Sequence, residues 1–368
     1  MKLIVEPADG VAPVLQAINR AKKSVEIAIF RFDRPDIETA LRAAAERGVR
    51  VTALIAFANR GGEKSLRKLE SRLLEAGIIV ARTADDLVKY HGKYILIDRR
   101  VLYVLSFNFT RLDIDRSRGF GLVTSQARCL REALKLFKAD CTRTRYTPRV
   151  ETFVVSPGNA RPVLGAFLAK AKTQLLIYDP SVSDKRMLRI LRERAKAGVE
   201  IRIVGKVSGS GFDVRKLTTP RLHTRTIIRD RRQAFVGSQS LRTAELDSRR
   251  EVGLIVTDSK VVKTLIETFE SDWKGSKTRR AASARASAAP PEAAKSSARE
   301  VAAAVDVFTK ELEPLVTSVK KAVRQAVVKA GEDVLHDSDV KDTMKKVVKR
   351  AVKEAVKEAV HEAQEAAR

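Results

Sequence analysis

The stretch HGKYILID occupies residues 91–98, and a second stretch of the same design, HTRTIIRD, occupies residues 223–230. In both, a cation follows the histidine by two residues and an aspartate follows it by seven. The residues are His91, Lys93 and Asp98 in the first copy, and His223, Arg225 and Asp230 in the second. Only four histidines occur in 368 residues, and two of them begin these stretches. A scarce imidazole placed twice beside a cation indicates chemistry rather than packing.

A short polar run follows each stretch at the same distance. It contains Ser106 and Asn108 after the first copy, and Gly237, Ser238 and Ser240 after the second. On a strand, side chains alternate between the two faces, so the histidine and the cation of one copy are expected on one face. The serines and Asn108, at the end of the next strand, are expected to add neutral hydrogen-bond donors beside them.

Both stretches lie inside an internal repeat. Ala21-Lys22-Lys23 aligns with Ala171-Lys172-Thr173, and this register holds without a gap as far as Gly48 and Gly198, each expected just past the end of a helix. The motifs align at a smaller offset because the first half carries an extra segment, 62–82, predicted as a helix and a strand. Strands alternating with helices predict an α/β fold, and repetition predicts two such units. Two half-sites facing each other across a pseudo-twofold axis would form one pocket.

The composition divides the chain further. We expect the first domain at residues 1–147, the second at 148–273, an Ala/Ser/Pro/Arg-rich disordered linker at 274–305 and a helical basic tail at 306–368. The net charge is +27, of which +21 belongs to residues 1–273. Such a charge favours contact with nucleic acid or an anionic membrane surface. The narrow Val/Ala stripe of the tail favours self-association through helices.

A pocket with two imidazoles and two cations suits a phosphodiester. The cations stabilise the negative charge on the phosphoryl oxygens, and one histidine attacks phosphorus. The other histidine protonates the leaving oxygen and then takes a proton from the incoming hydroxyl. No carboxylate cluster accompanies the motifs, so we expect neither a metal nor any other cofactor.

The pattern HxK-x4-D followed by S-x-N resembles the HKD signature of the phospholipase D superfamily, over roughly residues 5–273. The resemblance implies a pair of α/β sandwiches with one active site at their interface. It further implies that His91 is the nucleophile, that His223 is the general acid/base, and that a carboxylate, Glu251, orients His223. The motif residues Asp98 and Asp230 are expected to brace the scaffold.

The sequence departs from that signature at several positions. Arg225 replaces lysine, so the second motif is degenerate, and Ser240 replaces asparagine. Gly119 stands at the place in the first half that matches Glu251, which would leave His91 without an orienting carboxylate unless Asp113 or Asp115 replaces it.

The expected function is therefore that of a phosphodiesterase or phosphatidyltransferase acting on a phospholipid through a phosphohistidine. A metal-independent nuclease and an inactive phosphodiester-binding scaffold are the alternatives. The N-terminal residues lack the apolar run of a secretory signal, and no run has the length of a membrane span, which favours a cytoplasmic protein, peripheral at the inner face of the membrane. The substrate headgroup, the acceptor, and the choice between hydrolysis and transfer stay open at this point.

Overall fold

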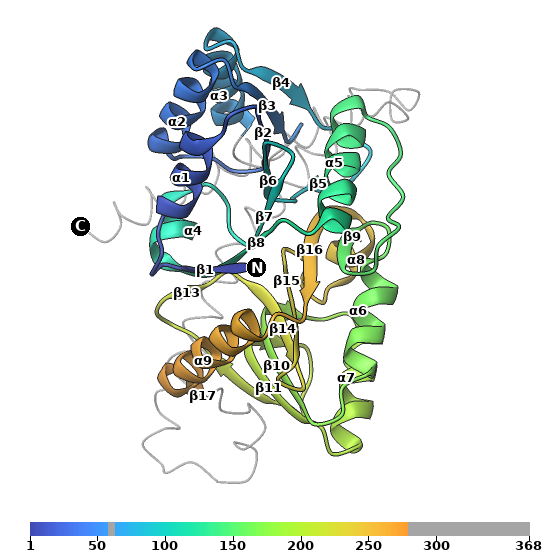
Figure 1. The fold of residues 1–368 in the computed structure, drawn as a ribbon. Coiled ribbons are helices and arrows are strands. Elements are labelled where there is room, and N and C mark those ends of the chain that lie inside the picture. Colours follow the sequence, from blue (N-terminus) through green and yellow to red (C-terminus); the bar gives the residue numbers. More distant parts are fainter. Residues whose placement is uncertain (58–62, 279–368) are drawn as a thin grey trace, which may run out of the picture. The chain divides into compact units, whose positions relative to one another are not determined.

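The computed structural model describes residues 1–57 and 63–278, and the expected tail helices lie outside these residues. The first half contains a mixed sheet with helices packed on it (Figure 1). Its elements are β1 (Lys2–Glu6), α1 (Ala12–Arg20), β2 (Ser24–Ile29), α2 (Pro35–Glu46), β3 (Arg50–Ile55), α3 (Glu63–Glu75), β4 (Ile79–Arg82), β5 (Lys89–Tyr90), β6 (Tyr94–Ile97), β7 (Val101–Leu105), α4 (Arg111–Arg116), β8 (Ser117–Thr124) and α5 (Ala127–Thr142). The strand order is β1-β8-β7-β6-β2-β3-β4.

The second half repeats this plan. Its elements are β9 (Phe153–Ser156), α6 (Ala160–Ala169), β10 (Gln174–Val182), α7 (Lys185–Lys196), β11 (Glu200–Val207), β12 (Asp213–Lys216), β13 (Arg221–Leu222), β14 (Arg225–Arg229), β15 (Gln233–Gly237), α8 (Thr243–Asp247), β16 (Arg249–Val256), α9 (Ser259–Gly275) and β17 (Lys277–Thr278). The strand order is β17-β12-β11-β10-β14-β15-β16-β5, and β9 pairs with β16. The predicted tandem α/β architecture is confirmed.

The expected difference between the halves is only partly correct. Helix α3 has no counterpart in the second half, but strand β4 does, since β12 pairs in parallel with β11 as β4 pairs with β3. The inserted segment is therefore the helix alone. The second half also continues past residue 273, because α9 ends at Gly275 and β17 adds a strand beside β12.

Local sequence explains where the repeated helices end. Gly48 and Gly198 follow α2 and α7 with φ of +80° and +85°, a left-handed conformation that costs glycine little. Each glycine returns the chain at once into the next parallel strand, as the sequence predicted.

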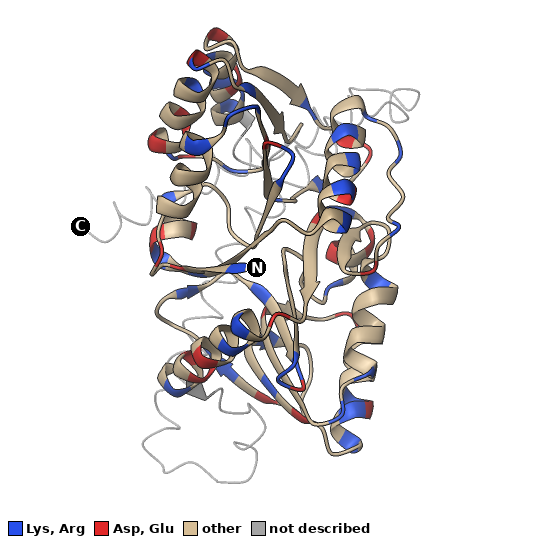
Figure 2. Ribbon diagram, viewed as in Figure 1, with Lys and Arg blue, Asp and Glu red and all other residues tan. Residues whose placement is uncertain are grey.

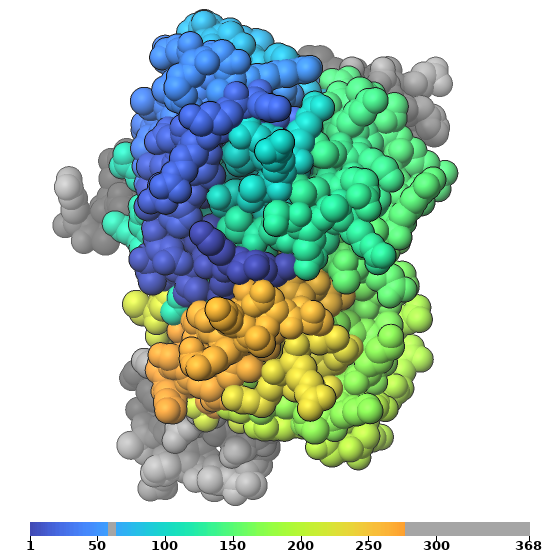
Figure 3. All heavy atoms as spheres, in the orientation of Figure 1, coloured from blue at the N-terminus to red at the C-terminus, as the bar shows by residue number. Residues whose placement is uncertain are grey.

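One hydrophobic core joins the halves. It is formed by inner-face residues of both sheets together with α5 and α9, whereas two further clusters lie within the first and the second half separately. Phe137 of α5 packs edge-on against Tyr94 at 6.1 Å, and its repeat counterpart Phe269 of α9 packs against Tyr178 at 4.9 Å. In the space-filling view the blue N-terminal residues lie directly against the orange part that contains α9 (Figure 3). The halves therefore share one folded unit.

Among the described residues, we find no helix with the length and apolar character needed to cross a bilayer.

Candidate active site

Two short strands exchanged between the halves position the histidines. Strand β5 pairs with β16 of the second half, and β13 pairs with β8 of the first half. The amide of His91 then donates to the carbonyl of Arg250 at 2.7 Å, and the amide of His223 donates to that of Arg118 at 3.2 Å. Each histidine lies where its chain leaves the sheet of the other half and enters its own. The expectation that both lie within regular strands is wrong, because β6 begins at Tyr94 and β14 at Arg225.

His91 is held by a carboxylate of the other half. Its Nδ1 lies 2.8 Å from Glu251 Oε2, and Nζ of Lys93 lies 2.7 Å from its Nε2. The ring of Phe30 packs edge-on against the imidazole at 4.6 Å. A carboxylate only accepts hydrogen bonds, so Nδ1 carries the proton and Nε2 presents a lone pair.

The expected pairing of Glu251 with His223 is therefore wrong, and His91 does not lack an orienting carboxylate. Strand β16 runs beside the strand that delivers His91, so a residue on it reaches the histidine of the opposite half. Sequence alignment of the repeat compares each residue with its counterpart and does not show which half it faces.

His223 has a different carboxylate neighbour. Its Nε2 lies 3.4 Å from Asp113 Oδ2, and Nδ1, which is buried, has no hydrogen-bond partner among the described residues. Arg221 also bonds to Asp113, while Asp115 pairs with Arg34 at 2.8 Å. The sequence predicts Asp113 only as a substitute partner of His91, but α4 places it against His223.

The two histidines and the two cations, Lys93 and Arg225, lie close enough for their charges to change one another's pKa. Burial lowers the pKa of His91 well below its usual value, and the charges of Lys93 and Arg225 lower it further. Burial likewise lowers the pKa of His223, together with Arg225, Lys93 and the charge of His91 itself. Lys93 is 1% exposed, and burial lowers its pKa to about 7. The side chains of His91 and His223 keep 10% and 12% of their area exposed, so both retain a narrow opening to solvent.

The serines that were expected to face substrate are instead bonded within the protein. Ser106 is fully buried, and its Oγ accepts a hydrogen bond from the amide of Phe120 at 2.8 Å. Ser238 is also fully buried, and its Oγ accepts from the amide of Val252 at 3.1 Å. Its hydroxyl lowers the pKa of Glu251, although burial has the larger, opposite effect and raises that pKa overall. Both serines therefore stabilise the backbone around the site and do not face the substrate.

Asn108 and Ser240, the last residues of the two polar runs, also form hydrogen bonds within the protein. Nδ2 of Asn108 donates to Asp113 at 2.6 Å, while the Oγ of Ser240 accepts from Nε of Arg225 at 3.2 Å. Gly237 lies where a Cβ would come within 2.7 Å of Gly253. A larger residue at Gly237 would separate β15 from β16.

The motif aspartates brace the sheet. Asp98 accepts hydrogen bonds from the amides of residues 22–24 at 2.6–3.1 Å, and Asp230 does the same for residues 172–174 at 2.7–3.1 Å. Although burial acts to raise it, these amides lower the pKa of both carboxyls overall. Both aspartates have φ near +50° and lie at the tight turn after the histidine-bearing segment. This position agrees with the structural role expected for them.

One acidic residue near the site was missed. Glu245 of α8 lies 132 residues after Asp113, the same offset as between the histidines, and its Oε2 accepts from the amide of Ser240 as Asp113 accepts from that of Asn108. Its charge acts to raise the pKa of His91. The constant offset was the signal that could have identified it.

The two halves carry a buried carboxyl at corresponding places, but on different strands. In the second half Glu251 of β16 pairs with Ser156 of β9, whereas in the first half Gly119 of β8 pairs with Glu6 of β1. Glu6 is fully buried, and this burial raises its pKa to about 8, although the backbone amide of Gly10 acts to lower it.

Glu6→Gln should stabilise the protein at pH 8 and have little effect at pH 4.5. The unfolded carboxyl ionises near 4.5, whereas the folded one keeps its proton up to about 8, so stability falls as pH rises between these values. The isosteric amide removes this loss, and we expect a Tm increase of about 5 °C at pH 8. Thermal unfolding at both pH values measures it, with Glu46→Gln at the exposed end of α2 as control. An equal shift at both pH values would contradict the assignment.

Within the described ranges, no group of three or more His, Cys, Asp or Glu side chains is arranged to hold a metal ion.

Comparison with known proteins agrees with the repeated motif. The family described as cardiolipin synthase, PLD-like domain, matches residues 14–141 and 205–273. This chain belongs to the phospholipase D superfamily. The two matched segments contain the two histidine motifs, one in each.

Several curated proteins resemble this superfamily member in sequence. Mitochondrial cardiolipin hydrolase of Mus musculus is 30% identical over 128 residues, covering 34% of the chain and 55% of the relative. Polyphosphate kinase of Pseudomonas aeruginosa is 25% identical over 223 residues, covering 55% of the chain and 32% of the relative. Cardiolipin synthase 1 of Bacillus anthracis is 21% identical over 338 residues, covering 75% of the chain and 66% of the relative. The chain thus spans about half the length of the mouse relative and a third of the kinase.

Solved structures agree with the fold of a phospholipase D superfamily member. Polyphosphate kinase from Porphyromonas gingivalis superposes with a TM-score of 0.63 at 19% identity, over 74% of this chain and 47% of the other. Phosphatidylserine synthase from Haemophilus influenzae Rd KW20 gives 0.59 at 10% identity, over 76% and 87%. At these identities the likeness establishes the architecture alone.

Proposed function

We propose that this protein cleaves a phospholipid phosphodiester through a covalent intermediate on His91. The hydrogen bond from His91 Nδ1 to Glu251 carries the proposal. It fixes the proton on Nδ1 and leaves Nε2 as the nucleophilic atom, while the lowered pKa keeps the ring neutral at physiological pH.

The proposed reaction has two displacements. Nε2 of His91 attacks phosphorus, a P–N bond forms, and the P–O bond to the leaving alcohol breaks as His223 protonates that oxygen. Water or a second alcohol then gives its proton to His223 and attacks phosphorus, and the P–N bond breaks to restore His91. Hydrolysis and phosphatidyl transfer differ only in which hydroxyl enters.

The cations stabilise the phosphoryl oxygens in this scheme. Lys93 donates to Nε2 of His91, and a bound phosphodiester oxygen would accept that hydrogen bond instead. The bound anion would also raise the lowered pKa of His223, because it offsets the charges of Arg225 and Lys93. Substrate binding would thereby favour the protonated form of His223, which donates the proton to the leaving oxygen.

A lipid substrate is favoured by the relatives. The mitochondrial cardiolipin hydrolase and the cardiolipin synthase are named after cardiolipin, a phospholipid that contains phosphodiesters. The phosphatidylserine synthase shares the fold. A nuclease is the second candidate, which the +21 charge of residues 1–273 favours.

Turnover of phosphatidyl lipids and of single- and double-stranded DNA, each with and without EDTA, tests the proposal. We expect lipid phosphodiester cleavage that EDTA does not abolish. Cleavage of DNA with none of lipid would reverse the choice between the two candidates. Loss of all turnover in EDTA, restored by a divalent cation, would contradict the histidine-only route.

We expect kcat/KM to fall by at least about tenfold between pH 6 and pH 8. The pKa of Lys93 is about 7, so over this range the free site changes from mainly ammonium to mainly neutral amine, which binds a phosphate anion less well. The depressed pKa of His223 acts in the same direction, because its protonated form becomes rarer as pH rises. A pH profile of kcat/KM measures this. Lys93→Arg, which keeps its charge, should flatten the profile, and a profile that rises through this range would contradict the assignment.

A further inference from the structure

A long groove follows the segment that links the two halves. It consists of two adjoining hollows with cavity volumes of about 720 and 630 Å³. Pro148, Asn159 and Pro162 line both, so the two hollows lie next to each other. We call this feature the link groove. Its walls are the link residues 143–152, the start of α6, and the β14–β15 hairpin.

Cations dominate the link groove. Those of the first hollow are Arg143, Arg145 and Arg250, and those of the second are Arg149, Lys170 and Arg229. The groove contains only two acids, Asp86 and Glu151, and Asp86 already accepts a hydrogen bond from Tyr90.

Most of these cations have no acidic partner. Only Arg250 forms an ion pair, with Asp140 at 3.1 Å, among the residues that the structure describes. Arg143, Arg145, Arg149 and Lys170 are exposed, and blue segments follow the link after α5 in Figure 2. Unpaired cations along a concave surface make it a strong attractor of anions.

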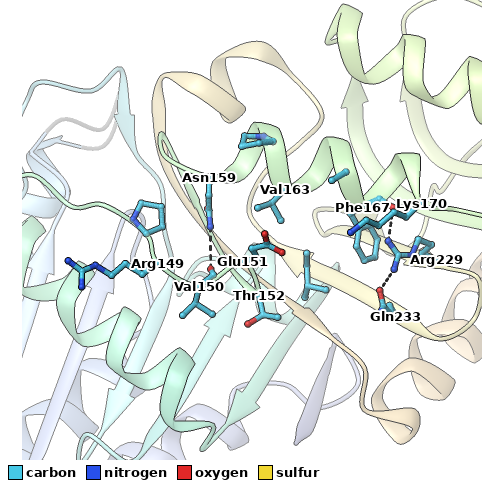
Figure 4. Close-up of a pocket in the computed structure, with 14 residues that line it drawn as sticks. Arg149, Val150, Glu151, Thr152, Asn159, Val163, Phe167, Lys170, Arg229 and Gln233 are labelled. Atoms are coloured by element: carbon cyan, nitrogen blue, oxygen red, sulfur yellow. Dashed lines mark hydrogen bonds between the residues drawn. The ribbon is translucent and has the colours of Figure 1, made fainter.

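The charges are distributed along the groove rather than gathered at one point. In Figure 4, Arg149 lies at one end of the second hollow, and Lys170 and Arg229 lie at the other. The neutral residues Val150, Thr152 and Val163 and one carboxylate, Glu151, lie between them. Arg143 and Arg145 continue the series in the first hollow. A single phosphate would meet only part of this series, whereas an extended polyanion would meet all of it.

We propose that the link groove binds single-stranded nucleic acid. A membrane surface is flat on this scale and cannot enter the hollows, whereas a flexible single strand can. An inorganic polyanion would leave the apolar and amide groups of the groove unused, among them Pro148, Val163 and Asn159. A nucleic acid brings sugars and bases to these groups and phosphates to the cations.

Arg229 gives the groove a surface on which a base can stack. Its guanidinium lies 4.4 Å from the centroid of the Phe167 ring, and it donates to the carbonyl of Phe167 at 3.0 Å and to Gln233. These contacts fix the guanidinium plane at one wall of the second hollow (Figure 4). Arginine held flat in this way stacks on nucleobases.

The link groove is separate from the catalytic histidines. Tyr90 and Arg250 reach its first hollow, but His91, Lys93, His223 and Arg225 line neither hollow. Binding there therefore does not depend on the phosphodiester chemistry proposed above.

The test is fluorescence anisotropy of a 5′-labelled dT20 oligonucleotide against the full chain in a His91→Ala background, at several salt concentrations. The groove variant carries Arg145→Gln, Arg149→Gln and Lys170→Gln, side chains without ion pairs or side-chain hydrogen bonds in the described part of the protein. Its matched control carries Lys185→Gln, Arg189→Gln and Lys196→Gln on the exposed side of α7, which changes the net charge equally.

We expect the groove variant to bind at least about tenfold more weakly and to lower the salt slope of log K by about 2, since each lost phosphate contact removes about 0.7. The control should bind as the parent does. Equal losses in both variants would reduce the effect to net charge and overturn the proposal, as would absence of binding by the parent at 50 mM salt. Competition by inorganic polyphosphate as strong as that by unlabelled dT20, phosphate for phosphate, would overturn the assignment to nucleic acid.

Discussion

His91→Ala should reduce turnover of the phosphodiester substrate by at least about 10⁴-fold, because it removes the Nε2 lone pair that attacks phosphorus, while His223 is used as the proton donor. Lys93 is a strong nucleophile only as the free amine, and its ammonium is needed for the phosphoryl oxygens. Rapid-quench assays with a labelled phosphatidyl substrate would measure the loss. His361→Ala, the same change outside both motifs, is the matched control and should retain full turnover.

Trapping the intermediate separates the roles of the two histidines. Acid-labile label should appear on His91 in the parent chain and be absent from His91→Ala. His223→Ala should still form some labelled intermediate with a substrate whose leaving group needs no proton. Label on His223 in the parent would reverse the assigned roles and contradict the tautomer that the Glu251 hydrogen bond imposes.

Glu251→Gln should lower kcat by roughly 10²–10⁴-fold with little change in KM, as expected when an orienting carboxylate is replaced by an amide that permits the wrong tautomer. The amide nitrogen would donate to Nδ1 of His91, which moves the imidazole proton to Nε2 and removes the attacking lone pair. Steady-state kinetics on a phosphatidyl substrate would measure both constants.

Folding stability provides the control for this substitution. Glu251 is fully buried and burial raises its pKa, so the isosteric amide should leave Tm unchanged or raise it at pH 8. Glu132→Gln, at a buried carboxyl of α5 that holds Tyr146 at 2.8 Å, should instead lower Tm and leave kcat intact. A loss of Tm that parallels the loss of kcat in Glu251→Gln would point to a purely structural role.

The repeat and the two motifs predicted the architecture and brought the right residue types together. Equal spacing from His91 to Asp98 and from His223 to Asp230 identified the histidines, the cations and the bracing aspartates. The partners of the imidazoles could not be read in the same way. Glu251 contacts His91 and Asp113 lies beside His223 only because β5 and β13 cross to the opposite sheet, and strands of two residues leave no periodic pattern in a sequence.

The roles of the serines were also beyond the sequence. Ser106 and Ser238 follow their strands as expected, but whether a hydroxyl faces the substrate or a backbone amide depends on how β8 and β16 pack beside it. Gly119 and Glu6 illustrate the same limit, since the carboxyl at the corresponding place in the first half lies on a neighbouring strand 113 residues away in the chain.

Exchange of β5 and β13 has a consequence for how such a protein could originate. In a single copy of the repeat, the short strand before the histidine would have no partner strand, because that partner belongs to the other half. Such a copy could position its imidazole only by associating with a second copy of itself. Covalent joining of two copies would then let each diverge, so that one motif can have lysine and the other arginine while both line the same site. Two fragments produced by cleavage between residues 147 and 148 would be expected to regain a common site only when mixed.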